Sequence, residues 1–364
     1  MKRSLPLSLL LTLFAAGAQA KTPVIFDNDM AIDDWATLLF LAREPSIELI
    51  AVTVAGSGEA HCAPGVSNAL ALLHLADPAM DVPVSCGDEV PLDGYFVFPQ
   101  AWQDDMDILS GVDVPRSPRS ADTRHAVDLM HAAIEESDEP VTILATGPMT
   151  NIAQWLRRYP SDRERVERIV IMGGSLDAPG NIIVPEFTDG HPNTLAEWNF
   201  FVDPMAADEL LRSGVAIEMV GLDVTNTVRV TAEFAATFKQ QADNPAARFW
   251  DEILDKNDWF IASDEYYFWD VLAALVVIDA ERFCSGEQRA LAVDVQPAGD
   301  KPWLQTSDLS IPPTRWDGAD RQHLASATAG AVIAGTGAAN TQVCLQTDGP
   351  GAFKLFTEVM TGEP

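Results

Sequence analysis

The chain has 364 residues and carries 54 Asp and Glu against 23 Lys and Arg, a formal net charge of −31. This excess of negative charge disfavours a nucleic-acid partner, because an acidic surface repels the phosphate backbone. Hydrophobic residues make up 47% of the chain, so it can bury a sizeable core, and the length fits one large α/β domain or two small ones.

The N-terminal twenty residues have the pattern of a signal peptide. Lys2 and Arg3 precede an apolar run that is too short to span a bilayer comfortably, and "AQA" at residues 18–20 has the small-x-small form of a signal peptidase site. We expect cleavage after Ala20, a periplasmic or secreted mature chain, and no membrane association after cleavage. A retained membrane anchor is the alternative.

The four cysteines are the other indication of compartment. An exported protein can form disulfides, and four cysteines allow three pairings. Cys62 with Cys86 and Cys284 with Cys344 would be the local choice, but the sequence alone proves neither pair.

Short apolar runs alternate with helical patterns after residue 20, which predicts an α/β fold with an open, mainly parallel sheet and helices on both faces. The expected strands cover residues 23–26, 47–56, 82–86, 141–146, 168–174 and 215–225. The expected helices cover residues 36–42, 65–76, 123–137, 203–214, 269–280 and 352–360, with two more within 231–256 and one after a Thr150 cap.

Residues 87–121 lack periodicity and are expected to form a functional loop or a surface excursion with its own small core. No repeat or linker is visible, so residues 21–364 are expected to form a single domain.

The stretch "VIFDNDMAIDD" places Asp27, Asp29, Asp33 and Asp34 within eight positions. Two of them follow the first strand and two open the next helix, at the edge of a parallel sheet where ligands bind. A helix dipole stabilises each carboxylate by only about 0.3–1 kcal/mol, which is too little to hold several together. A hard divalent cation would do so, and all-oxygen ligation favours calcium or magnesium over zinc. Chance clustering in an acidic chain, or helix capping, is the competing interpretation.

Five blocks in order along the chain resemble the inosine-uridine nucleoside hydrolases. The first is "DNDMAIDDWATLLFLA", similar to the family's D-x-D-x-x-x-D-D signature, and it is highly specific only in combination with the others. The other four blocks are "TGPMTNIA" (146–153), "IMGG" (171–174) with Gly180–Asn181, "AEWNFFVDPMAA" (196–207) and "WDVLAAL" (269–275).

The resemblance implies the nucleoside hydrolase fold, a tightly bound Ca²⁺, and hydrolysis of the N-glycosidic bond of ribonucleosides to ribose and free base. It also implies residue roles. The calcium ligands would be Asp29, Asp34, Asp270 and the carbonyl of Thr146. The ribose hydroxyls would be bound by Asp33, Asn181, Glu197 and Asn199, and Met172 would line the sugar pocket. Asp27 would lie beside the metal site as a supporting carboxylate. The binding partner would be a small-molecule nucleoside. The resemblance also allows a homo-oligomer, either a dimer or a tetramer.

The residue types suit this chemistry. The sugar becomes oxocarbenium-like as the base leaves, and surrounding carboxylates favour the developing positive charge. Calcium would hold the ribose diol and a water together and lower the pKa of that water, whose proton Asp29 would take.

Three segments depart from the family pattern. Trp269 stands where some branches have a histidine that protonates the base; its resemblance to the purine-preferring branch implies stacking and purine substrates, with a core tryptophan as the alternative. Ser57 stands where Asn or Asp is common, so that Glu59 or His61 would take over the contact, or the position would be vacant. Asn181 and Glu197 are about ten residues farther apart than usual, because of an insertion around residues 182–192, and this makes Glu186 a rival to Glu197.

Two further questions stay open. Tyr95, Phe96, Phe98 and Trp102 would form either a second wall of a base-stacking site or a hydrophobic flap packed against the body. A non-catalytic periplasmic nucleoside- or ribose-binding protein on the same scaffold is the alternative function. A D-x-D phosphatase is less favoured, because no Lys or Arg lies in "DNDMAIDD" to bind phosphate.

Overall fold

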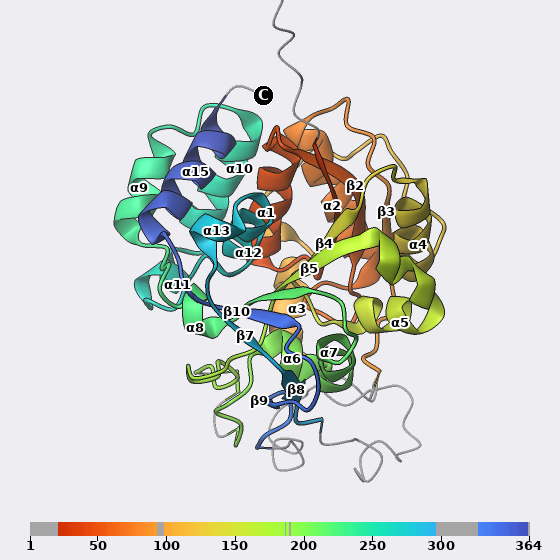
Figure 1. The fold of residues 1–364 in the computed structure, drawn as a ribbon. Coiled ribbons are helices and arrows are strands. Elements are labelled where there is room, and N and C mark those ends of the chain that lie inside the picture. The colour runs from red at the N-terminus through yellow and green to blue at the C-terminus, as the bar shows by residue number, and fades with distance from the viewer. Residues whose placement is uncertain (1–20, 93–97, 186, 189–190, 296–326, 363–364) are drawn as a thin grey trace, which may run out of the picture.

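The computed structural model describes residues 21–92, 98–185, 187–188, 191–295 and 327–362. The expected signal peptide, Tyr95, Phe96 and Glu186 lie outside these residues. The described chain forms an eight-stranded sheet in the order β3-β2-β1-β4-β5-β6-β10-β7 and a two-stranded sheet of β8 and β9 (Figure 1). The eight-stranded sheet is parallel apart from its last strand, β7, which runs antiparallel to β10. The predicted open, mainly parallel α/β fold is confirmed.

The strand bounds are as follows: β1 Thr22–Asn28, β2 Ile47–Val54, β3 Val84–Cys86, β4 Val141–Ala145, β5 Val166–Met172, β6 Ile217–Val220, β7 Ser285–Arg289, β8 Leu291–Val293, β9 Val332–Ala334 and β10 Thr341–Gln346. The central strands are buried on both faces, β4 along its whole length, as their continuous Val, Ile, Leu and Phe runs predict.

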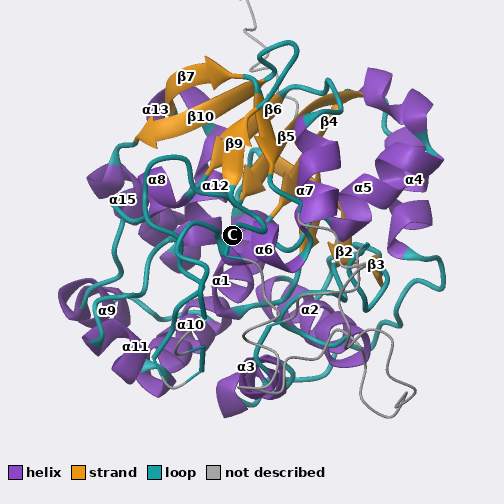
Figure 2. Ribbon diagram, turned by 90° about the horizontal axis from the view of Figure 1, so that it is seen from below, coloured by secondary structure: helices purple, strands orange, loops and turns teal. Residues whose placement is uncertain are grey.

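Helices cover both faces of the sheet, and Figure 2 shows them on its two sides. One core joins the sheet to α1 (Ile32–Arg43), α2 (Cys62–Ala76), α10 (Pro245–Lys256), α12 (Trp269–Ile278) and α15 (Gly349–Thr361). A second core joins the opposite face to α4 (Ala126–Glu136), α5 (Thr150–Arg158) and α7 (Pro204–Leu211). The remaining helices are α3 Gln100–Met106, α6 Trp198–Val202, α8 Leu222–Thr225, α9 Ala232–Lys239, α11 Asp258–Ala262 and α13 Ala280–Phe283, with short 3₁₀ helices η1 Leu109–Gly111 and η2 Pro160–Arg165.

The strand order fixes where a ligand can bind. The chain leaves β1 for β2 on one side and returns to β4 on the other, so the crossovers diverge between β1 and β4. Open parallel sheets bind ligands at such a switch point, outside the carboxyl ends of the strands. Asp29 directly follows β1 and Thr146 directly follows β4, so two predicted site residues lie on either side of this position.

Two sequence predictions about local structure are wrong. The expected strand at 215–225 ends at Val220, because Gly221 packs so closely on Gly174 that an added Cβ would lie 2.6 Å from its carbonyl oxygen, and α8 follows. Thr150 does not cap its helix; Met149 occupies the cap position, and the Thr150 hydroxyl instead donates to Asp203 Oδ2 at 2.6 Å.

The aperiodic segment 87–121 contains α3 and η1, and so it is partly helical among the residues that the structure describes. Both local disulfides are present: Cys62–Cys86 ties the start of α2 to the end of β3, and Cys284–Cys344 ties β7 to β10. The local pairing left open by the sequence is confirmed.

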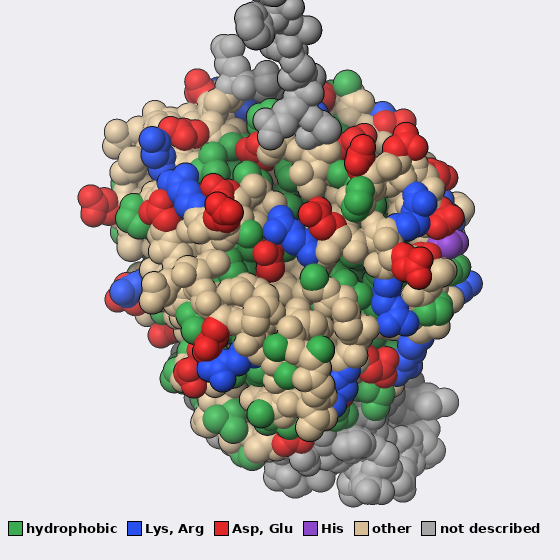
Figure 3. All heavy atoms as spheres, viewed as in Figure 1, with side chains coloured by type: hydrophobic (Ala, Val, Ile, Leu, Met, Phe, Trp, Pro, Cys, Tyr) green, Lys and Arg blue, Asp and Glu red, His purple; other side chains and the backbone are tan. Residues whose placement is uncertain are grey.

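Acidic and basic side chains are interspersed on the face of the molecule in Figure 3, rather than gathered into one patch of a single sign. Within the described residues, every helix is too short or too polar to cross a bilayer.

Candidate active site

The predicted site residues gather at the carboxyl ends of β1, β4 and β5 and at the starts of three helices. Asp33 and Asp34 lie in the first turn of α1, Asp270 in the first turn of α12, and Glu197 and Asn199 at the start of α6. The fold therefore collects side chains from opposite ends of the sequence at the switch point.

Asp34 is the best-anchored carboxylate of the group. Its Oδ2 accepts the backbone N–H groups of Asp29 at 3.2 Å and Ala31 at 2.9 Å, and its Oδ1 accepts the hydroxyl of Thr146 at 2.6 Å. Asp34 is fully buried. The side chain thus joins the end of β1 to the end of β4, and it caps the first turn of α1 in place of the alanine at the cap position.

Asp29 is held from the other side by the loop that follows β2. Its Oδ2 accepts the backbone N–H of Glu59 at 3.1 Å, and its carbonyl oxygen accepts the N–H of Ala60 at 2.9 Å. Glycines pack directly on this aspartate, since a Cβ added at Gly58 would lie 2.1 Å from Asp29 Cβ, and one at Gly147 would lie 2.8 Å from the same atom. The position of Asp29 is consequently fixed by backbone from three strand ends.

The carboxylates of the cluster raise one another's pKa. Burial, followed by repulsion from Asp29, raises the pKa of Asp33 to about 7, and burial raises that of Asp34 to about 6. Burial raises the pKa of Asp29 and Asp270 well above the usual value, and repulsion between the four carboxylates adds to the effect. No Lys, Arg or His lowers any of these four pKa values. Within the described chain, therefore, the negative charge of this cluster is not compensated.

Asp27 lies in β1, next to this cluster. Its Oδ1 accepts hydrogen bonds from Thr53 at 2.6 Å and from Asn151 at 2.8 Å, whereas its buried Oδ2 has no partner among the described residues. Burial raises its pKa to about 7. Its contacts bind β1 to β2 and α5, which agrees with a supporting position rather than one that faces substrate.

The predicted ribose-binding residues form a hydrogen-bonded group around α6. Asn199 donates its side-chain amide to the carbonyls of Thr146 at 2.8 Å and Met172 at 3.1 Å, so it links the ends of β4 and β5. Glu197 caps α6 by accepting the N–H groups of Asn199 and Phe200, and it also accepts the N–H of Gly174 at 2.9 Å.

These contacts leave polar atoms available on the same residues. Asn181 uses its Oδ1 to accept the Trp198 N–H at 3.1 Å, which leaves its amide group as a hydrogen-bond donor. Glu197 is buried, and burial raises its pKa to about 7. Its three backbone donors fix the carboxyl group in place beside Asn199, with lone pairs remaining for a hydroxyl donor.

Trp269 lies at the first position of α12, next to Asp270, and is only partly buried. Its ring packs against Phe260, Tyr266 and Tyr267, with centroids 5.9, 5.8 and 5.6 Å away, and its indole N–H has no partner among the described residues. The ring therefore belongs to an aromatic group beside the carboxylates, and its polar edge remains unsatisfied.

Tyr266 is a residue that the sequence patterns did not single out. Its side chain is 1% exposed, and burial, followed by the charges of Asp33 and Asp270, raises its pKa well above the usual value. Its hydroxyl has no hydrogen-bond partner in the described part of the chain, although it is close enough to interact electrostatically with Asp33 and Asp270. A tyrosine near the start of a helix is too common a signal for sequence reasoning to detect this placement.

The structure decides between several alternatives left open by the sequence. Ser57 does not contact the cluster; its hydroxyl is 2.8 Å from that of Thr150, which in turn donates to Asp203. His61 is paired with Asp107, Nδ1 to Oδ2 at 2.7 Å. Glu59 alone among the three candidates of this loop interacts electrostatically with Asp29 and Asp33.

Phe98 and Trp102 are packed as a flap, not as an open stacking wall. Phe98 is 3% exposed and stacks on Trp198 at 5.0 Å, and Trp102 lies across Trp198 and Phe187. Phe187 belongs to the insertion, so the insertion covers this aromatic group next to Glu197.

The oxygen-only donor set fits a hard cation, although the donors are not yet in a ligating arrangement. Among the described residues, no group of three or more His, Cys, Asp or Glu side chains is arranged so that it could hold a metal ion. The predicted set, however, contains a backbone carbonyl beside its three carboxylates, and the four crowded carboxylates lack a positive partner. Calcium and magnesium prefer oxygen ligands of these kinds, so the residue types suit a divalent cation.

Fold and site together define the class: an open, mainly parallel α/β protein with a cluster of acidic residues at the carboxyl ends of its strands. The family profile described as "Inosine-uridine preferring nucleoside hydrolase" matches residues 24–354. The chain belongs to this family, and it is an enzyme that hydrolyses the N-glycosidic bond of ribonucleosides.

Relatives differ in the bases that their names give. The chain is 34% identical over 236 residues to a pyrimidine-specific ribonucleoside hydrolase RihA of Citrobacter koseri, covering 64% of this chain and 70% of the relative. It is 25% identical to the solved purine-preferring ribonucleoside hydrolase of Gardnerella vaginalis, with a TM-score of 0.72 over 94% of this chain and 98% of that one. A nucleoside hydrolase structure from Bacillus anthracis, 20% identical over 93% of this chain and 99% of its own length, has the same fold with a TM-score of 0.72.

Proposed function

We propose that this enzyme is a calcium-dependent nucleoside hydrolase that releases free base and ribose from purine ribonucleosides. The observation that carries the proposal is a group of four carboxylates, which no cation of the described chain contacts: Asp29, Asp34 and Asp270 are buried, and Asp33 is partly buried. Such a group suits a hard cation together with a sugar that becomes positively charged during bond cleavage.

Asp29, Asp34, Asp270 and the Thr146 carbonyl would hold the Ca²⁺. When bound, this ion supplies the positive charge that holds the ribose diol and lowers the pKa of the attacking water. The Thr146 carbonyl already accepts the Asn199 amide at 2.8 Å, and an oxygen with two lone pairs can serve both partners.

The remaining roles belong to the chain's own side chains. Asp29 accepts the proton of the attacking water, since its carboxylate is fixed by the Glu59 N–H at the edge of the cluster. The ribose hydroxyls are bound by Asp33, Asn181, Glu197 and Asn199. Met172 lines the sugar pocket at the end of β5, where its carbonyl accepts the Asn199 amide. The negative charge gathered there stabilises the oxocarbenium-like ring.

The purine preference rests on Trp269. An indole cannot donate a proton as an imidazolium does, but its face can stack on a two-ring base, and here it lies within an aromatic group beside Asp270. The purine-preferring structure of G. vaginalis supports this assignment. The pyrimidine-specific relatives favour the competing assignment, that the substrates are pyrimidine ribonucleosides. Their sequence identity to this chain is higher than that of the G. vaginalis enzyme, but it extends over a shorter part of the chain.

A nucleoside panel tests substrate and metal together. Inosine, adenosine, guanosine, uridine and cytidine would be incubated with mature protein before and after chelation, with added Ca²⁺ or Mg²⁺ as the restoring ion, and the free base would be quantified by liquid chromatography. We expect purines to be cleaved faster, chelation to stop the reaction and Ca²⁺ to restore it. Faster cleavage of uridine and cytidine would overturn the purine assignment, and full activity after complete metal removal would overturn the calcium assignment.

Replacing Asp29 tests the proton acceptor. Asp29→Asn keeps the size of the side chain and removes its basicity, so kcat for the best substrate should fall on the order of 10³-fold. Bound calcium, measured by elemental analysis, and circular dichroism would show whether metal and fold are retained. A variant that keeps its metal and turns over at the wild-type rate would assign the proton to another group.

We further propose that residues 1–20 are removed as a signal peptide, and that residues 21–364 act as one domain in the periplasm or outside the cell, as a homo-oligomer, either a dimer or a tetramer. The two disulfides support export, because such bonds persist in oxidising compartments. N-terminal sequencing of protein from fractionated cells should begin at Lys21, and light scattering of the purified protein would give its oligomeric state. A chain in the cytoplasmic fraction that still begins at Met1 would contradict export.

A further inference from the structure

The loop between β2 and α2, residues 55–61, covers one side of the carboxylate cluster. Its backbone binds Asp29 twice, through the N–H groups of Glu59 and Ala60. Gly58 lies so close that any side chain there would overlap Asp29. The loop is therefore part of the wall of the active site.

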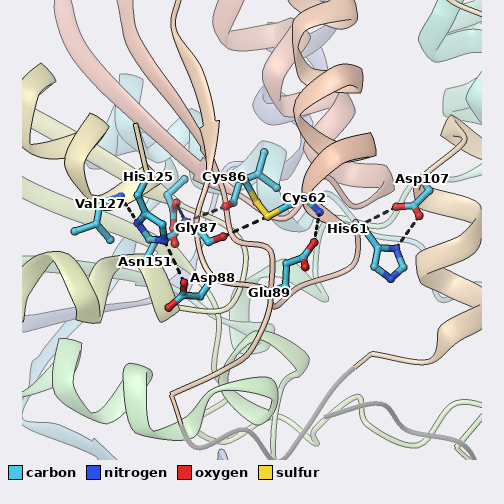
Figure 4. The surroundings of a disulfide bond; sticks show 12 residues. His61, Cys62, Cys86, Gly87, Asp88, Glu89, Asp107, His125, Val127 and Asn151 are labelled. Carbon is cyan, nitrogen blue, oxygen red and sulfur yellow. Dashed lines mark hydrogen bonds and ion pairs between the residues drawn. A yellow bond between two sulfur atoms is a disulfide. The ribbon is translucent and has the colours of Figure 1, made fainter. Parts of the chain in front are cut away.

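Contacts on both flanks hold this loop in place. The Gln103 side-chain amide, from α3, donates to the carbonyl of Gly58 at 3.1 Å, and Asp107 binds both the backbone N–H and the ring of His61, at 2.9 and 2.7 Å. The disulfide Cys62–Cys86 follows immediately, and Figure 4 shows it between the His61–Asp107 pair and Gly87. The backbone of Glu59 is thereby held beside Asp29.

The Glu59 carboxylate is partly buried and has no hydrogen-bond partner in the described part of the chain. The charges that act on it are those of Asp29, Asp33 and Asp105, all negative. Asp105 has its own donor in the hydroxyl of Ser110 at 2.9 Å, and His61 is occupied by Asp107. Glu59 is thus an unsatisfied acceptor at the Asp29 and Asp33 side of the cluster.

A second unsatisfied group lies near the same carboxylates. The Tyr266 side chain is 1% exposed, its hydroxyl has no hydrogen-bond partner among the described residues, and the charges of Asp33 and Asp270 act on it. The hydroxyl of Tyr266 and the partly buried carboxylate of Glu59 therefore both keep hydrogen-bonding capacity near Asp33 that a polar ligand can use.

We propose that Glu59 is a substrate-binding residue of this hydrolase, whose carboxylate accepts a hydrogen bond from a hydroxyl group of the ribose. The inference rests on the proposed function and adds a residue to its sugar site. Glu59 acts on the sugar because its charged neighbours include Asp29 and Asp33, which the proposed function assigns to the attacking water and to the ribose. An uncompensated carboxylate at this place also favours the positive charge that develops on the sugar ring.

Separate binding measurements with the two products, ribose and free base, distinguish a Glu59 that contacts the sugar from one that contacts the base. Metal-loaded wild type, Glu59→Ala and Glu59→Gln would be titrated by calorimetry with D-ribose and, separately, with hypoxanthine. Hydrogen bonds to charged groups predict that Glu59→Ala weakens ribose binding about ten- to a hundredfold, whereas hypoxanthine binding is unchanged. Glu59→Gln keeps an acceptor oxygen and should recover a large part of the ribose affinity. Both variants retain the backbone N–H that binds Asp29.

Glu89→Gln is the matched control. Glu89 is an exposed acid beside the same disulfide, where its carboxylate accepts the Cys62 N–H at 3.3 Å (Figure 4). This variant should bind ribose as the wild type does. Kinetics with inosine should show the loss in Glu59→Ala mainly as a higher KM.

The outcomes are distinguishable from failure of the proposed function. Wild-type ribose affinity in Glu59→Ala would overturn the inference, as would a loss of hypoxanthine binding or of bound calcium in that variant, since these would make Glu59 a base or metal residue. Failure of the wild type to cleave any nucleoside would instead refute the proposed function, and the ribose titration would still decide the role of Glu59.

Discussion

Two neighbouring loops of the site are held in different ways. In the loop after β1, which carries Asp29 and Asp34, the Asp34 carboxylate accepts the N–H groups of Asp29 and Ala31 within the loop itself, in addition to the hydroxyl of Thr146 after β4. The loop after β2, which carries Glu59, is fixed by α3, by Asp107 and by a disulfide to β3. A loop whose geometry is encoded locally is recognisable as a sequence motif, whereas a loop held by distant segments is not.

The comparison predicts that the two loops fail differently. A substitution where the two loops touch should disturb the geometry of both. Removal of a contact that holds the β2 loop from a distant segment should disturb the β2 loop alone. Two changes test this, in order of expected effect on activity, and a third concerns stability outside both loops.

Gly58→Ala acts where the loops touch. The added Cβ would lie 2.1 Å from Asp29 Cβ and 2.4 Å from its Oδ2, so either the loop or Asp29 must move. We expect a loss of about 1–3 kcal/mol in the free energy of unfolding and, because misplaced catalytic groups react poorly, a loss of about ten- to a hundredfold in kcat/KM. Urea unfolding and inosine kinetics would measure both.

Gly349→Ala is the control for the glycine substitution itself. A Cβ there meets only Val228 Cγ2 at 3.7 Å, an ordinary contact at the first position of α15. Its stability and activity should stay near those of the wild type. If Gly58→Ala behaved in the same way, the close packing of the two loops would not constrain Asp29.

Removal of the disulfides separates stability from site geometry. Replacing both cysteines of a pair by serine should cost about 3.5 kcal/mol for Cys62–Cys86 and about 4.3 kcal/mol for Cys284–Cys344 by the chain-entropy relation, since the sequence separations are 24 and 60. Only the first pair borders the Glu59 loop. We therefore expect its removal to raise KM several-fold at a temperature where both variants remain folded, and removal of the second pair to leave KM unchanged. Equal KM values in the two variants would show that the disulfide does not position the loop.

His191 gives the smallest effect and lies outside both loops. Burial lowers its pKa from 6.5 to about 4, and its Nδ1 accepts the Asn193 N–H at 3.1 Å. Because the folded state holds the imidazole neutral, its contribution to stability is complete above pH 6.5 and is lost as the pH falls toward 4. Relative to His191→Asn, the wild type should lose on the order of 1 kcal/mol across this range. Melting curves at pH 7 and pH 4.5 measure the change, and parallel pH dependence in both proteins would contradict it.

The sequence predicts the central strands and the long helices because their patterns are continuous: "VTILA" for β4 and "WDVLAALVVI" for α12 are nearly apolar throughout. It fails where a distant contact decides local structure. Gly221 ends β6 early because it packs on Gly174, and Thr150 donates to Asp203 instead of capping α5. The same limit applies to the site: the contacts of Asp34 follow from its motif, but no pattern indicates that Tyr266 lies near Asp33.

The arrival of Asp270 from α12 has a consequence for biosynthesis. The N-terminal aspartates leave the ribosome early, but their partner follows only after about three quarters of the 364 residues have been made. Until Asp270 arrives, the N-terminal aspartates stay hydrated and apart. The repulsion among the four carboxylates therefore arises late, when most strands of the sheet that hold them together have been made. Metal binding by the proposed ligands Asp29, Asp34, Asp270 and the Thr146 carbonyl would therefore begin only after Asp270 has been made.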